Sequence, residues 1–108
     1  MVRISINYAG LSADLRPRVE QVLQTIVSDN NTRLLIDAHA DTLNISFGHL
    51  GADKALGVTN NDTPNATIVF NLDRLTKNSS GEVVYSLGGG AEKHFLQTPF
   101  INADDRNL

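Results

Sequence analysis

One long amphipathic segment, residues 13–28, constrains the fold most, because its apolar residues recur with the period of a helix. They fall at i, i+4, i+7, i+8, i+11 and i+12 and so form one continuous stripe: Leu15, Val19, Val22, Leu23, Ile26 and Val27. Pro17 fits a helix only inside its first turn, and Asp29-Asn30-Asn31 is expected to end it. The sequence therefore predicts a single helix with one buried face.

Short segments with strand character surround this helix. Residues 2–8 alternate apolar and polar side chains, and that period of two is typical of a strand with one buried face. Residues 33–37 contain the apolar run Leu34-Leu35-Ile36 and predict a buried strand, so residues 38–41 become the turn of a hairpin. The same alternation predicts further strands at three places along the chain: 42–48, 66–72 and 82–87.

These segments predict an α+β fold. We expect a mostly antiparallel sheet of about five strands, with helix 13–28 packed on one face. The 108 residues form a single small domain, 1–108. Residues 49–64 read as a long polar loop of the kind that carries function or moves. Gly88-Gly89-Gly90 reads as a flexible break, and the apolar segment 94–101 is expected to pack against the core.

Composition and charge argue against several partners and compartments. The net charge is −3, and the nine Lys and Arg residues are spread along the chain. Nucleic-acid binding is therefore unlikely, because it draws on clustered cations, and the same holds for an anionic membrane surface. The chain has no cysteine, so thiolate metal sites are excluded. No signal peptide is visible at the N-terminus, and we expect a soluble protein that is cytoplasmic rather than secreted.

The triplet Asp37-Ala38-His39-Ala40-Asp41 is the strongest chemical motif. In an extended strand, alternate residues share a face, so two carboxylates and an imidazole would converge. Oxygen and nitrogen ligands of this kind suit manganese, iron or zinc, and a water bridging two such ions is a good nucleophile. The competing interpretation is a plain hairpin turn, in which aspartate bonds its own backbone. We favour the turn, because a five-residue match is a weak signal.

Two family resemblances bear on this segment. Residues 34–42 resemble the metal-binding segment of the ureohydrolases, which would make Asp37, His39 and Asp41 ligands of a paired manganese site. The other ligand segments of that family are absent from the sequence, and its fold is larger than this chain. The order of helix, hairpin, polar loop and strand is also similar to the region ahead of the zinc helix in some bacterial effector metallopeptidases. That zinc helix is absent from the sequence.

The remaining histidines, His49 and His94, are candidate catalytic residues. Either could act as a general base near neutral pH and complete a site with His39. The competing interpretation is a solvent-facing or hydrogen-bonded histidine. The glycine run before His94 could cradle an anion, but it lacks the spacing of known phosphate loops, which favours a hinge.

The favoured hypothesis is a non-enzymatic small binding or assembly domain that acts through protein–protein contacts. Its partner would be another protein or a second copy of the chain, and its candidate surfaces are loop 49–64, the free sheet edge and segment 94–101. The alternative is a metal-dependent hydrolase, or a fragment of one, that uses the Asp-x-His-x-Asp cluster and a divalent metal such as manganese or zinc. A second alternative is a small bacterial or phage effector or toxin. Whether the chain is an enzyme stays open on the sequence.

Overall fold

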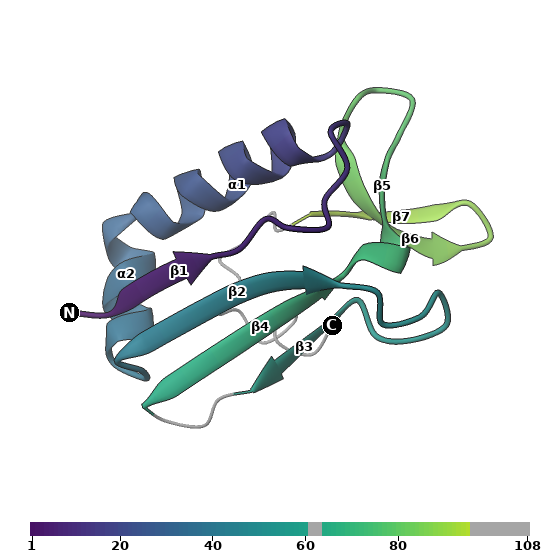
Figure 1. Cartoon of the computed structure of the whole chain (residues 1–108). Helices are drawn as coiled ribbons and strands as arrows, with labels where there is room; N and C mark the ends of the chain where they lie inside the picture. Colours follow the sequence, from purple (N-terminus) through teal and green to yellow (C-terminus); the bar gives the residue numbers. More distant parts are fainter. Residues whose placement is uncertain (61–63, 96–108) are drawn as a thin grey trace.

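Figure 1 shows the computed structural model of the chain, which describes residues 1–60 and 64–95. Two helices and two sheets make up this part of the chain. Their bounds, in chain order, are β1 (Arg3–Ile6), α1 (Arg16–Ser28), α2 (Asn30–Asp37), β2 (Thr42–Gly48), β3 (Gly57–Asn60), β4 (Asn65–Asn71), the 3₁₀ turn η1 (Leu72–Arg74), β5 (Leu75–Lys77), β6 (Val83–Gly88) and β7 (Ala91–His94).

The larger sheet has the strand order β1-β2-β4-β3, and the smaller one has the order β5-β6-β7. Strands β1, β2 and β4 run parallel, whereas β3 runs antiparallel to β4. The smaller sheet is antiparallel throughout. The α+β class is therefore confirmed, but the expectation of one mostly antiparallel sheet of five strands with a single helix is wrong, because the larger sheet is mixed and a second helix is present.

The predicted strand at 33–37 and the predicted hairpin turn at 38–41 are also wrong, because helix α2 occupies this segment. Asp29 ends α1 and caps the start of α2, where its carboxylate accepts hydrogen bonds from the N–H and the hydroxyl of Thr32 at 2.9 and 3.0 Å. An aspartate at this position satisfies N–H groups that have no partner inside the helix. Leu34 and Leu35, expected in the core, are 67% and 50% exposed.

This second helix explains why β1 and β2 are parallel. A two-residue turn reverses the chain, but parallel neighbours need a long crossover. Helices α1 and α2 together form that crossover, and both lie on one side of the sheet (Figure 1). Helix α1 begins at Arg16 rather than residue 13, which places Pro17 in the first turn as expected. It buries Val19, Leu23 and Val27 against the sheet.

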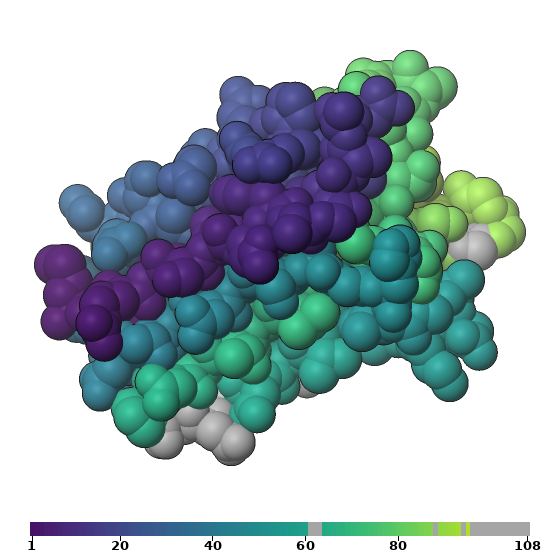
Figure 2. Space-filling view, viewed as in Figure 1, coloured from purple at the N-terminus to yellow at the C-terminus, as the bar shows by residue number. Residues whose placement is uncertain are grey.

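The two faces of the larger sheet differ in chemistry. The face toward the helices is apolar, and the register aligns its side chains in rows across the strands, with Ile6 beside Ile45 and Ile45 beside Ile68. The opposite face carries mainly small polar side chains, with Val58 and Val69 as apolar residues and Arg3 as its single charge among the described residues. Figure 2 views this outer face, and no helix crosses it there.

A chain of aromatic rings joins the two sheets into one core. Phe47 lies 5.6 Å from Phe70, Phe70 lies 5.3 Å from Phe95, and Phe95 lies 5.6 Å from Tyr85, each between ring centroids. Offset and edge-to-face arrangements at such distances are favourable for aromatic pairs. Phe95 is buried, as expected for the start of segment 94–101. The rest of that segment, with Phe100, lies outside the described residues.

The glycine run 88–90 belongs to the connection between β6 and β7 instead of forming an open break. Gly89 and Gly90 have φ values of 59° and 83°, a region that favours glycine because it has no Cβ. The run therefore serves a tight reversal. In the part of the chain that the structure describes, no helix combines the length and apolar character needed to cross a membrane.

We predict that Leu23→Ala destabilises the fold by roughly 2–5 kcal/mol, because it opens a cavity beneath α1. Leu23 is 0% exposed. The matched control is Leu34→Ala on α2, which removes the same atoms from an exposed site and should change the free energy of unfolding by less than about 0.5 kcal/mol. Urea unfolding of both variants measures the difference, and equal losses would contradict the burial of this face of α1.

Candidate functional site

The structure places Asp37, His39 and Asp41 at the carboxyl end of α2 and in the link to β2, with no extended strand between them. One carboxylate oxygen of Asp37 lies 3.6 Å from the N-terminal amine of Met1. The N–H of His39 donates to Ile36, and the N–H of Asp41 donates to Pro64, at 2.9 and 2.8 Å. The backbone geometry that would make the three side chains converge is therefore absent.

Within residues 1–60 and 64–95, no group of three or more His, Cys, Asp or Glu side chains is arranged to hold a metal ion. The assignment of the Asp-x-His-x-Asp residues as ligands gains no support from this geometry and stays a prediction. His39 and His49 lie at opposite ends of the seven-residue strand β2. At the rise of an extended strand this separates them by about 20 Å, so the two histidines do not share a site.

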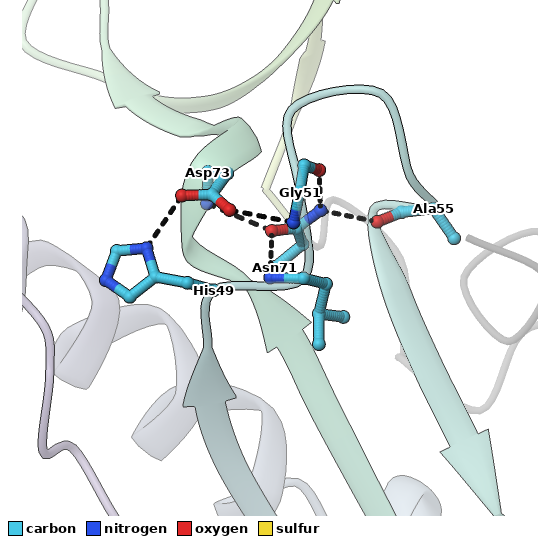
Figure 3. Close-up of polar contacts among 6 residues, drawn as sticks. His49, Gly51, Ala55, Asn71 and Asp73 are labelled. Carbon is cyan, nitrogen blue, oxygen red and sulfur yellow. Dashed lines mark hydrogen bonds and ion pairs between the residues drawn. The ribbon is translucent and has the colours of Figure 1, made fainter.

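A second polar cluster lies at the carboxyl ends of the parallel strands β2 and β4, where ligands of parallel sheets commonly bind. Its centre is Asn71, the last residue of β4. Along β4 this position belongs to the outer, polar face, yet Asn71 is 0% exposed. It is buried because residues 49–56, which connect β2 to β3, fold over it (Figure 3).

The side chain of Asn71 makes four hydrogen bonds. Its amide nitrogen donates to the carbonyls of Gly51 and Ala55 at 2.8 and 2.9 Å. Its oxygen accepts from the N–H groups of Leu50 and Asp73 at 3.1 and 3.0 Å. An amide side chain has two donors and two acceptor lone pairs, so this residue is fully satisfied. Three of the four bonds hold the loop at its beginning and end.

His49 and Asp73 lie beside this centre. The Nδ1 atom of His49 is 2.7 Å from one carboxylate oxygen of Asp73, and the other oxygen accepts the N–H of Gly51 at 2.7 Å. An ionised carboxylate only accepts hydrogen bonds, so Nδ1 carries the proton. The hydrogen bonds from His49 and Gly51 lower the pKa of Asp73 below its ordinary value. The imidazole is 72% exposed.

Of the two ring nitrogens of His49, Nδ1 is the one that faces Asp73. The exposure of the His49 ring is ordinary for a surface histidine. The hydrogen bonds that Asp73 accepts mainly fix the position of the loop. The other predicted candidate, His94, is the last residue of β7, where its backbone pairs with Val84. The side chain of His94 lies outside the described part of the structure.

The loop held by Asn71 leads into β3, which is an edge strand. The N–H of Asn71 donates to the carbonyl of Leu56 at 2.8 Å, directly before β3 begins. Strand β3 then pairs with β4 from Gly57 to Asn60 without a register shift. In the strand order of the sheet it has a neighbour on one side only. Val58, in its middle, is 53% exposed.

The two edges of the larger sheet are protected differently. Strand β1 at one edge carries the exposed charge of Arg3, and the guanidinium of Arg33 donates to the carbonyl of Val2, just before the strand, at 3.3 Å. Charges, proline, bulges and covering groups are the devices that keep edge strands from pairing. Strand β3, with the sequence Gly-Val-Thr-Asn, has no charge, no proline and no bulge. Among the described residues β3 is therefore an edge strand without these protective features, and Val58 is its exposed apolar residue.

Sequence reasoning missed strand β3 and the buried position of Asn71. Residues 49–64 were expected to be one loop, because four residues are too few to show a period of two. The signal was the β-branched pair Val58-Thr59 between Gly57 and Asn60, which favours a short strand. Asn71 falls inside the predicted strand 66–72, and the sequence pattern assigns no role to Asp73. An asparagine buried in this way is visible only when the loop that covers it is placed.

We predict that Asn71→Asp destabilises the fold by about 3 kcal/mol or more, because an oxygen then faces the carbonyls of Gly51 and Ala55 and two buried acceptors lose their donor. The control is Asn44→Asp, the same change at an exposed position of β2, which should stay within about 0.5 kcal/mol. Urea unfolding gives the free energies, and amide hydrogen exchange should show faster exchange in loop 49–56 of Asn71→Asp only.

The lowered pKa of Asp73 gives a pH-dependent prediction. A carboxyl whose pKa is lower in the folded than in the unfolded chain stabilises the fold while it is ionised. The stability advantage of the wild type over Asp73→Asn should therefore be present at pH 7. It should disappear as the pH falls through the ordinary value of 3.8 and below it. Urea unfolding at fixed ionic strength from pH 3 to pH 7 measures this advantage, and a constant difference would refute the assigned role.

Comparisons of the chain with protein-family models, curated proteins and solved structures gave no match. The function must therefore be argued from the contacts and surfaces of the molecule itself.

Proposed function

We propose that the domain is a non-enzymatic protein-binding module that accepts an extended segment of a partner as an additional strand beside β3. The observation that carries this proposal is the position of β3 at the edge of the described strands, with Val58 exposed and no charge, proline or bulge to oppose pairing. Strand addition draws its affinity from main-chain hydrogen bonds and its specificity from alternate side chains. The fixed position of β3 supports it, since a strand held in place loses little entropy on binding.

The side chains around the edge indicate what kind of segment fits. Val58 and its cross-strand neighbour Val69 lie on the outer face, where they form a small apolar site beside uncharged Asn44 and Thr67. A partner strand would place one side chain opposite Val58. Cross-strand pairs of β-branched residues are favourable, so a β-branched apolar residue fits this position. The partner segment is therefore extended, uncharged and rich in valine, isoleucine or threonine.

The charge distribution supports a protein partner over a nucleic acid. The outer face of the larger sheet holds one cation among its described residues, Arg3, and the whole chain has a net charge of −3. Phosphate backbones require several cations on one surface. Hydroxyl and amide side chains with two valines form a surface that a neutral polypeptide can cover without desolvating charges.

Selection from a displayed library of random seven-residue peptides tests this proposal. We expect the full chain to enrich peptides with β-branched residues, and we expect Val58→Lys to weaken their binding at least about tenfold, because a charged side chain on an edge opposes pairing. Biolayer interferometry with the selected peptides measures the affinities. The matched control is Ser5→Lys, the same charge at the opposite edge, which should leave binding unchanged.

Urea unfolding of both lysine variants must first show wild-type stability, which their exposed positions predict. Selected peptides that bind Val58→Lys as tightly as the wild type would refute β3 as the binding edge. Failure to enrich any peptide would refute strand addition from outside the chain.

A further inference from the structure

Two titratable side chains, His49 and Asp73, join the start of loop 49–56 to the turn η1 (Figure 3). We propose that they form a pH-sensitive contact that holds the start of the loop more tightly when His49 is protonated. The loop then opens more often as the pH rises from mildly acidic to mildly basic. The contact needs no partner and is independent of the proposed function.

The carboxylate of Asp73 holds the loop with both of its oxygens. Oδ1 lies 2.7 Å from Nδ1 of His49, and Oδ2 accepts the N–H of Gly51, also at 2.7 Å. Between these two residues, the N–H of Leu50 donates to the side chain of Asn71 at 3.1 Å. Because the two oxygens belong to one rigid group, the contact with His49 also orients the oxygen that accepts from Gly51.

The backbone of Gly51 is built for this contact. Its φ of 115° lies in a region that favours glycine, and a Cβ at this position would lie 2.9 Å from Cγ of Lys54. The carbonyl of Gly51 accepts from Asn71 at 2.8 Å, and its N–H donates to Asp73. This residue is therefore held from both sides, and a weaker bond to Asp73 leaves it held from one.

Protonation changes the strength of the contact. A histidine side chain changes its charge roughly between pH 5 and pH 8, and a hydrogen bond between charged partners is roughly twice as strong as a neutral one. The 2.7 Å between Nδ1 of His49 and Oδ1 of Asp73 lies in the range of charged pairs. Desolvation opposes the charge little, because the imidazole is 72% exposed. Protonated His49 therefore binds Asp73 more tightly than neutral His49.

The loop and η1 bring three further charges to this region. Asp53 and Lys54 are adjacent exposed residues of the loop with opposite charges. Arg74 follows Asp73, and its guanidinium donates to the carbonyl of Lys54 at 2.7 Å. Together with the carboxylate of Asp73 these groups have no net charge, so the direct contact decides which state of His49 holds the loop better.

The other elements around the contact bring no unmatched charge. Strands β2, β4 and β6 have no charged residue. Segment 7–11 has none either, and it lies against η1, because a Cβ at Gly10 would lie 3.1 Å from Leu72. At the start of α1, Arg16 pairs with Glu20 at 2.6 Å, so its charge is met within its own helix.

The direction of the pH dependence follows from the two groups. A histidine charge that strengthens a contact is present below the ordinary histidine value of about 6.5 and is lost as the pH rises through it. The contact also needs an ionised Asp73, and the hydrogen bond from His49 lowers the pKa of this carboxyl below its ordinary value of 3.8. The contact is therefore strongest between roughly pH 4 and pH 6.

Amide hydrogen exchange followed by NMR tests this inference, because the protection factor of the Gly51 N–H reports how often the loop opens. The protection factor is the exchange rate of an unstructured chain at the same pH divided by the measured rate, so the pH dependence of the exchange chemistry cancels. We expect it to fall about two- to fivefold from pH 5.5 to pH 8, the effect of an exposed ion pair. It should stay below that of Leu23, which is buried under α1.

Two variants and a matched control assign the effect to the pair. His49→Gln keeps a neutral donor and Asp73→Asn removes the negative charge, so both should make the protection factor of Gly51 independent of pH. His39→Gln changes another exposed histidine beyond the opposite end of β2 and should keep the wild-type dependence. In the wild type, the ring signals of His49 and the amide signal of Gly51 should shift with one midpoint.

Three outcomes would overturn the inference. The first is a wild-type protection factor of Gly51 that does not change between pH 5.5 and pH 8. The second is a change that persists in His49→Gln, which would assign it to another group. The third is a Gly51 protection factor equal to that of Leu23 at both pH values, since the loop would then open only when the whole fold unfolds. The first and third outcomes need no variant, so they decide even where Asp73→Asn does not fold.

Discussion

The hydrogen bonds of the buried Asn71 side chain are the interaction on which the placement of strand β3, at the edge of the larger sheet, depends. Its amide group reaches the carbonyls of Gly51 and Ala55, so it ties both ends of the loop between β2 and β3 to the end of β4. A buried amide is costly unless every donor and acceptor is satisfied. Leu56 at the end of the loop is buried in the core, and the satisfied polar side chain of Asn71 holds the rest of the loop in place.

The parallel core of the larger sheet gives this polar centre its location. Because β2 and β4 run in the same direction, their carboxyl ends meet at one edge, and the residues that follow them, His49 and Asp73, become neighbours. In the mostly antiparallel sheet expected from the sequence, neighbouring strands would place their carboxyl ends at opposite edges. The connection between β2 and β4 runs through loop 49–56 and strand β3, which is antiparallel to β4, and neither helix contributes a side chain to the site.

The sequence predicts the parts of this fold that have a long, regular pattern. The stripe of α1 and the alternation of β2, β4 and β6 are visible as periods, and the α+β class follows from them. Helix α2 was missed because an apolar run of three residues fits a strand and a helix equally. Asp29 was expected only to end α1, whereas it also caps α2 through Thr32. Strand β3 and the role of Asn71 depend on contacts between distant residues, which no local pattern records.

The two edges of the larger sheet differ in the features that oppose pairing, which supports the proposed role of β3. An unprotected edge strand is a hazard in any soluble protein, because it pairs with whatever strand it meets. This chain protects its other edge with Arg3 and with the guanidinium of Arg33 over the carbonyl of Val2, which shows that its composition does not lack suitable residues. At the same time it fastens β3 firmly through Asn71. A strand that is held rigid and left uncharged is arranged as a binding edge would be, since flexibility or one lysine would have removed the hazard.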